Sequence, residues 1–132
     1  MYSEHDTRLI ILVVEDVAET RDGIEKLLTA DGYLVAVARD ERDAIESARR
    51  KRPDLILVSL AGLTSEVIAA ARRVREHADL GHLVPVVIFC VESIDEGDDL
   101  AIGENVHISR PDNFNQLRRL LIRLLPKVPV AA

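Results

Sequence analysis

The chain has 132 residues, of which 48% are hydrophobic and 30% charged, enough apolar material for the core of one globular domain. Its 17 basic and 23 acidic residues give a formal net charge of −6, which argues against a general binder of nucleic acid. Two tyrosines, two phenylalanines and no tryptophan leave little aromatic surface on which bases, flavins or sugars could stack.

The cysteine content and the terminal segments indicate a cellular location. The single cysteine, Cys90, excludes an internal disulfide and fits a reducing compartment. The first residues lack the basic and apolar regions of a secretory signal, and no apolar run approaches the roughly 18 residues of a membrane span. We therefore expect a cytoplasmic protein without membrane contact, with a domain over 9–125 between an N-terminal tail (1–8) and a C-terminal tail (126–132).

Apolar runs and amphipathic stretches alternate along the chain. Continuous β-rich runs are typical of parallel strands buried on both faces, and apolar residues three and four apart are typical of helices. The segment 92–102 is weakly amphipathic and acidic, and the strand that follows it is the least hydrophobic, so we expect that strand near an edge. The predicted strands are 9–14, 34–38, 55–58, 84–90 and 105–109, and the predicted helices are 17–30, 40–52, 92–102, 113–125 and one that begins at Ser65.

This alternation predicts an α/β fold, a doubly wound five-stranded parallel sheet with helices on both faces. Ligands on such sheets bind outside the carboxyl ends of the strands. The polar residues expected there are Glu15, Asp16, Ser59, Cys90 and Arg110.

Several short motifs, taken in their order and spacing, carry a resemblance. They are Ile11–Asp16, Arg52–Val58, Val84–Val87, Gly103 and Arg110-Pro111. Together they resemble a bacterial response-regulator receiver domain, from about Leu9 to Leu125. The resemblance implies the flavodoxin-like (βα)5 receiver fold and a place in two-component phosphorelay signalling.

The resemblance also assigns roles to the polar residues. In that family an acidic pair after the first strand holds Mg²⁺, an Asp ending the third strand accepts a phosphoryl group, a Thr or Ser ends the fourth strand, and a Lys precedes Pro on the fifth. This chain keeps only the acidic pair, Glu15-Asp16; it has Ser59 at the phosphoacceptor position, Cys90 for Thr or Ser, Arg110 for Lys and His107 at the aromatic switch position.

These replacements change the expected chemistry. Ser59 is neutral, needs a base and would form a stable ester rather than a labile acyl phosphate. Loss of a charged ligand should leave Glu15 and Asp16 at most a weak or vestigial Mg²⁺ site. Arg110 has a planar guanidinium group that can bind a carboxylate through two hydrogen bonds, and it is expected to pair with Asp16 or Glu15 in place of the ion. Cys90 is expected to pack as a small apolar residue.

We therefore interpret the chain as a pseudo-receiver, not an enzyme, that acts in bacterial signalling as a phosphorylation-independent protein-interaction module. Its partner would be a histidine kinase or an output protein. Two alternatives remain open: a receiver still phosphorylated at Asp16 or Ser59 with Mg²⁺, and a flavodoxin-like domain that binds a small ligand.

The resemblance points to one interaction surface, built from the segments 92–102, 105–109 and 113–125. An acidic and a basic patch lie on neighbouring elements there and are self-complementary under two-fold symmetry, which predicts a homodimer or a similarly charged partner. The candidate surface residues are Asp95, Asp99, His107, Arg118, Arg119, Ile122 and Arg123.

Overall fold

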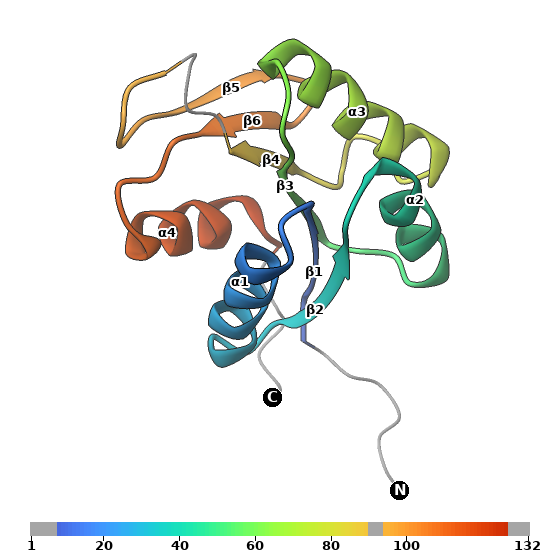
Figure 1. Cartoon of the computed structure of the whole chain (residues 1–132), viewed down its shortest axis with the longest axis horizontal. Coiled ribbons are helices and arrows are strands. Elements are labelled where there is room, and N and C mark those ends of the chain that lie inside the picture. Colours follow the sequence, from blue (N-terminus) through green and yellow to red (C-terminus); the bar gives the residue numbers. More distant parts are fainter. Residues whose placement is uncertain (1–7, 90–93, 127–132) are drawn as a thin grey trace, which may run out of the picture.

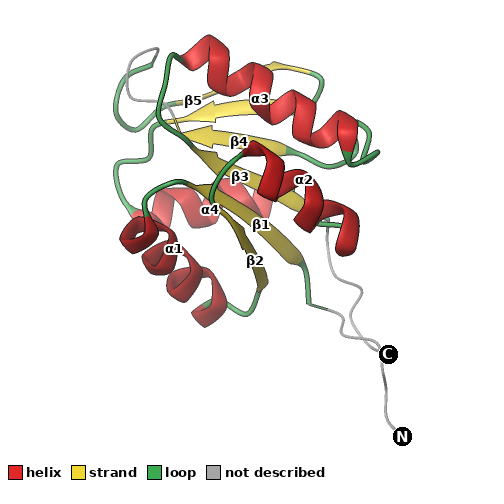
Figure 2. Ribbon diagram, turned by 45° about the vertical axis from the view of Figure 1, so that its right-hand side comes forward, coloured by secondary structure: helices red, strands yellow, loops and turns green. Residues whose placement is uncertain are grey.

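Strands and helices alternate through most of the chain and form a central sheet with helices on both faces (Figures 1 and 2). The structure is a computed structural model and describes residues 8–89 and 94–126. The strands are β1 (Ile10–Glu15), β2 (Leu34–Ala38), β3 (Leu55–Ser59), β4 (Val86–Phe89), β5 (Asp99–Gly103) and β6 (Val106–Ser109), and the helices are α1 (Ala18–Ala30), α2 (Glu41–Arg50), α3 (Thr64–His77) and α4 (Phe114–Leu124).

The sheet has the strand order β2-β1-β3-β4-β6-β5. All neighbouring pairs are parallel except β5 and β6, which are antiparallel. Without β5 this is the flavodoxin-like order, in which the chain reverses direction across the sheet between β1 and β3. The predicted α/β receiver fold is confirmed.

Alternating side chains of the buried strands supply two separate cores. On β1, Leu12 and Val14 face the layer of α2 and α3, whereas Ile11 and Val13 face the layer of α1 and α4. The helices contribute their apolar stripes to these cores: Ala44, Ala48, Val67, Ala71 and Val74 on the first face, and Leu28, Leu117, Leu120 and Leu121 on the second.

Two of the helices begin at caps that the sequence contains. The side chain of Asp40 accepts a hydrogen bond from the Asp43 backbone N–H at 2.8 Å, and Asn113 accepts one from Gln116 at 3.0 Å. These caps satisfy amide groups that have no partner inside the helix.

The segment predicted as the fourth helix is the main correction. Within its described part, Asp99–Gly103 forms β5, the edge strand, so the sheet has six strands rather than five and β6 lies one strand inward. The turn between β5 and β6 has positive φ at both Glu104 (56°) and Asn105 (62°), the pattern of a two-residue hairpin. Leu100 and Ile102 alternate as strand residues do, and this hairpin signal was stronger than the weak helical periodicity.

None of the described helices has the length and apolar content that crossing a membrane requires. The predicted tails, 1–8 and 126–132, lie almost wholly outside the described residues.

Candidate functional site

The carboxyl ends of the parallel strands meet at one edge of the sheet, as expected. In the register between β1 and β3, Glu15 lies opposite Ser59, and between β4 and β6, Phe89 lies opposite Ser109. Arg110 follows Ser109 directly. Cys90, which was predicted at the same edge, lies outside the described residues.

Glu15 is the buried member of the acidic pair, with an exposed fraction of 4%. Its Oε2 accepts a hydrogen bond from the Val17 backbone N–H at 3.0 Å, and the Arg21 guanidinium donates to its backbone oxygen at 2.9 Å. The carboxylate therefore fastens the loop that leads into α1, a structural task that occupies one of its oxygens.

Asp16 and Ser59 are less constrained. Asp16 is exposed, and neither its carboxylate nor the Ser59 hydroxyl has a hydrogen-bond or ion-pair partner among the described residues. A serine becomes a nucleophile when a neighbouring base takes its proton. No such base is bonded to Ser59 in the described part of the chain.

Arg110 does not have the expected partner. Its guanidinium donates to the Ile94 backbone oxygen at 3.3 Å, and within residues 8–89 and 94–126 it forms no ion pair with Glu15 or Asp16. The reason is the turn before β5, where Gly97 donates to the Arg110 oxygen at 2.7 Å and Arg110 donates to the Asp98 oxygen at 3.0 Å. These backbone contacts hold Arg110 beside the segment that carries the Ile94 oxygen.

The described side chains at this edge offer few charged ligands for a magnesium ion. Mg²⁺ prefers hard, charged oxygen ligands in near-octahedral geometry. Here one oxygen of Glu15 accepts a hydrogen bond from Val17, Asp16 is exposed and Ser59 adds no charge. In the described residues, no group of three or more His, Cys, Asp or Glu side chains is placed to hold a metal ion.

The predicted interaction surface is partly neutralised inside the chain. Arg123 pairs with Asp99 at 2.9 Å, so one residue of the basic patch and one of the acidic patch pair within one molecule. Arg118 pairs at 2.7 Å with Asp31, the residue that follows α1, and lies 4.6 Å from the centre of the Phe114 ring. Ile122 is 70% exposed.

Two of the remaining surface residues, Asp95 and Arg119, are exposed as predicted. His107 is partly buried on β6. Because the Asn105 amide nitrogen donates to the His82 oxygen at 2.9 Å, its Oδ1 is the acceptor, and His107 Nε2 donates to it at 3.0 Å. Burial lowers the pKa of His107; Arg123 lowers it further and Asp99 opposes the shift.

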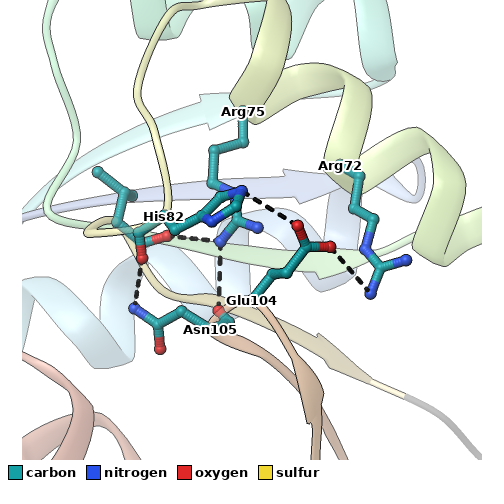
Figure 3. A network of polar contacts seen from close by, with 6 residues as sticks. Arg72, Arg75, His82, Glu104 and Asn105 are labelled. Carbon is teal, nitrogen blue, oxygen red and sulfur yellow. Dashed lines mark hydrogen bonds and ion pairs between the residues drawn. The ribbon is translucent and has the colours of Figure 1, made fainter.

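A polar network at the other end of the sheet was not predicted (Figure 3). Arg75 of α3, only 3% exposed, donates to the backbone oxygens of Val84 at 3.1 Å and Asn105 at 3.4 Å. Glu104 lies 4.0 Å from the Arg72 guanidinium and 3.3 Å from His82 Nε2. These side chains line a cavity of about 400 Å³.

One sequence signal could have revealed this network. Arg75 follows Val67, Ala71 and Val74 on the apolar stripe of α3. An arginine at an inward position is rarely buried without hydrogen-bond partners, so its presence there predicts nearby acceptors.

The strand order and the polar carboxyl edge define a receiver-like α/β domain. Residues 11–121 match the profile of the response regulator receiver domain, and the chain belongs to that family. The predicted family membership is therefore confirmed.

The chain is similar in sequence to parts of several described proteins. The chain is 31% identical over 128 residues to the sensor histidine kinase AruS of Pseudomonas aeruginosa, covering 94% of this chain and 13% of that protein. It is 27% identical over 121 residues to the response regulator MprA of Mycolicibacterium vanbaalenii, covering 88% of this chain and 52% of that regulator. The chain thus spans a small part of the first relative and about half of the second.

Solved structures agree with the fold. The receiver domain of the sensor histidine kinase PA1611 of Pseudomonas aeruginosa, solved with a magnesium ion in its active-site cleft, has a TM-score of 0.65 and 29% identity, covering 89% of this chain and 97% of that chain. The chemotaxis protein CheY4 of Vibrio cholerae has a TM-score of 0.68 and 24% identity, covering 89% and 99%. The chain is a receiver domain of the kind used in two-component signalling.

Proposed function

We propose that this receiver domain works as a pseudo-receiver, a protein-interaction module of bacterial signalling that does not depend on phosphorylation of an aspartate. The observation that carries the proposal is Ser59, which lies at the carboxyl end of β3 opposite Glu15, where the receiver resemblance places the phosphoacceptor. A neutral hydroxyl without a bonded base is a poor acceptor. Such a domain has no catalytic role of its own and signals through contacts.

The magnesium and phosphate chemistry supports the same proposal. Glu15 is engaged by Val17, and Arg110 is engaged by the Ile94 oxygen rather than held toward Ser59. We propose that Mg²⁺ binds at Glu15 and Asp16 weakly or not at all. The two rival functions, phosphorylation at Asp16 or Ser59 and binding of a small ligand at this edge, lack a comparable observation in their favour.

Intact mass spectrometry tests the proposal directly. The full chain is incubated with acetyl phosphate and Mg²⁺, and a receiver with a conventional aspartate serves as the positive control for the phosphodonor. We expect the mass to stay unchanged. A stoichiometric gain of one phosphoryl group on Asp16 or Ser59 would replace this proposal by the first rival.

The second rival is tested by thermal stability. A small ligand that binds the folded domain raises its unfolding temperature. We expect no shift with nucleotides or flavins, because the chain is poor in aromatic residues on which their rings could stack. A saturable shift would favour the small-ligand domain.

The partner is a histidine kinase or an output protein, as the family membership suggests. The face of α4 contributes Arg119 and Ile122, which remain exposed for such a contact. A homodimer through this face stays a prediction, and the internal pair of Asp99 and Arg123 removes part of its charge argument. Sedimentation of the wild type and an Arg119→Glu, Arg123→Glu variant at low and high salt tests it; a dimer that the variant loses would support it.

A further inference from the structure

The β5 strand leaves one edge of the sheet open. Among the described residues β5 pairs only with β6, and it forms the outermost strand on that side (Figure 1). An edge strand presents backbone N–H and C=O groups that another chain can pair with. Lysine and proline commonly protect such edges, and β5, with the sequence DLAIG, contains neither.

An apolar side chain marks the same edge. Leu100 is 52% exposed and lies opposite Ile108 of β6, which is 4% exposed. Residues opposite each other share a face, so Leu100 lies on the face that α3 covers, where Ile102 packs against the core. An apolar residue on an added strand would cover the exposed half of Leu100.

Polar contacts lie at both ends of this strand. At one end Arg123 pairs with Asp99 at 2.9 Å. At the other end Glu104 lies between Arg72 and His82, as Figure 3 shows. A strand that is already ordered loses less conformational entropy when a partner binds. The register changes between Ala101 and Gly103, which limits the regular part of the edge and favours a short partner segment.

The charges near the edge select the partner's chemistry. Asp95, Glu96 and Asp98 are exposed, and they form no ion pair with any described residue. Basic side chains on an added strand would meet these carboxylates. A second copy of the chain, with its net charge of −6, would bring acidic residues together instead.

We infer that β5 accepts, as an additional strand, a short extended segment of a partner protein in which lysine or arginine residues flank an apolar residue. This inference deepens the proposed function, on which it rests, because it locates the protein contact and describes its chemistry. Backbone hydrogen bonds would hold the added strand on β5. Contact with Leu100 and with the acidic residues would select a partner segment that carries apolar and basic side chains.

The test uses the full chain and a fluorescent peptide of alternating lysine and valine as the probe. We expect saturable binding by anisotropy that weakens as salt rises, together with slower hydrogen exchange of β5 amides. Leu100→Lys should weaken binding by about tenfold or more, because it adds a charge at the contact. Leu83→Lys is the matched control, since Leu83 is 90% exposed on the loop before β4 and should leave binding unchanged.

Two further arms make the result decisive. A proline at the centre of the peptide removes a backbone donor and should abolish binding. Absence of binding to the wild type, or equal binding by the Leu100→Lys variant or by the proline peptide, overturns the inference. Self-association of the wild type that Leu100→Lys removes would assign the edge to a second copy instead.

Failure of this inference is distinguishable from failure of the proposed function. Binding is measured with and without acetyl phosphate and Mg²⁺, and the mass of the protein is recorded in each sample. Peptide binding that occurs only after phosphoryl transfer would contradict the proposed function but would still support β5 as the binding site. Absence of peptide binding together with an unchanged protein mass would contradict only the inference that β5 binds the partner segment.

Discussion

Glu15 lies opposite Ser59 in the register of β1 and β3, and the carboxylate of Glu15 is turned back onto the Val17 amide. The two residues are neighbours at the edge where a receiver would carry out phosphoryl transfer. Glu15 accepts a hydrogen bond from the loop before α1, and Ser59 carries no charge. This arrangement supports the proposal that Glu15 and Asp16 bind Mg²⁺ weakly or not at all.

Restoring a carboxylate at Ser59 should restore a response to magnesium. Ser59→Asp places like charges opposite each other and should lower the free energy of unfolding by up to about 1 kcal/mol without metal. Mg²⁺ should then raise the unfolding temperature of the variant, because it binds the folded state, and leave the wild type unchanged. Differential scanning calorimetry with and without Mg²⁺ measures this.

Ser59→Asn is the matched control, since it has nearly the same shape without the charge. A magnesium response in Ser59→Asn or in the wild type would show that Glu15 and Asp16 bind the ion unaided, against the proposal of a vestigial site.

Removing the Glu15 carboxylate should destabilise the loop before α1. Glu15→Ala deprives the Val17 N–H of its acceptor in a partly buried setting and should lower the free energy of unfolding by about 1–3 kcal/mol. Glu15→Gln keeps an acceptor oxygen and should cost less. Urea denaturation measures both, and equal losses in the two variants would show that the charge rather than the hydrogen bond matters.

The buried arginine of α3 should be important for stability. Arg75→Ala leaves the Val84 oxygen without its donor and opens a cavity, whereas the Asn105 oxygen keeps the Val86 N–H as a donor. The free energy of unfolding should fall by about 2–4 kcal/mol. Arg73→Ala removes an arginine of the same helix whose ion pair with Glu41 is exposed to solvent, and it should change stability less. Similar losses for the two variants in urea denaturation would count against a structural role for the network in Figure 3.

His107 should make stability depend on pH. Burial is the largest cause that lowers its pKa below the ordinary 6.5, so the unfolded chain binds a proton more readily than the folded one. The stabilisation is present above pH 6.5 and is lost as the pH falls through the lower pKa of the folded state. His107→Gln keeps a donor for Asn105 and removes the titration. Chemical denaturation at about pH 8 and about pH 5 should show a larger decrease for the wild type than for His107→Gln.

Much of the fold follows from local patterns. The continuous apolar runs at β1 and β3 predicted buried parallel strands, and Asp40 and Asn113 predicted the start of their helices, because burial and capping act over a few residues. The position of Glu15 beside Ser59 was predictable for a related reason. Carboxyl ends of parallel strands converge on one edge wherever the strands are correctly identified.

Contacts between distant segments were decided by the tertiary structure. Weak helical periodicity favoured a helix over 92–102, but pairing with β6 and the turn at Glu104 and Asn105 made β5 a strand, because backbone hydrogen bonding depends on the neighbour that is available. The strand β5 placed Asp99 beside Arg123, and the segment before β5 placed the Ile94 carbonyl beside Arg110. A long side chain pairs with whichever acceptor the fold brings within reach, and no spacing along the chain specifies that acceptor.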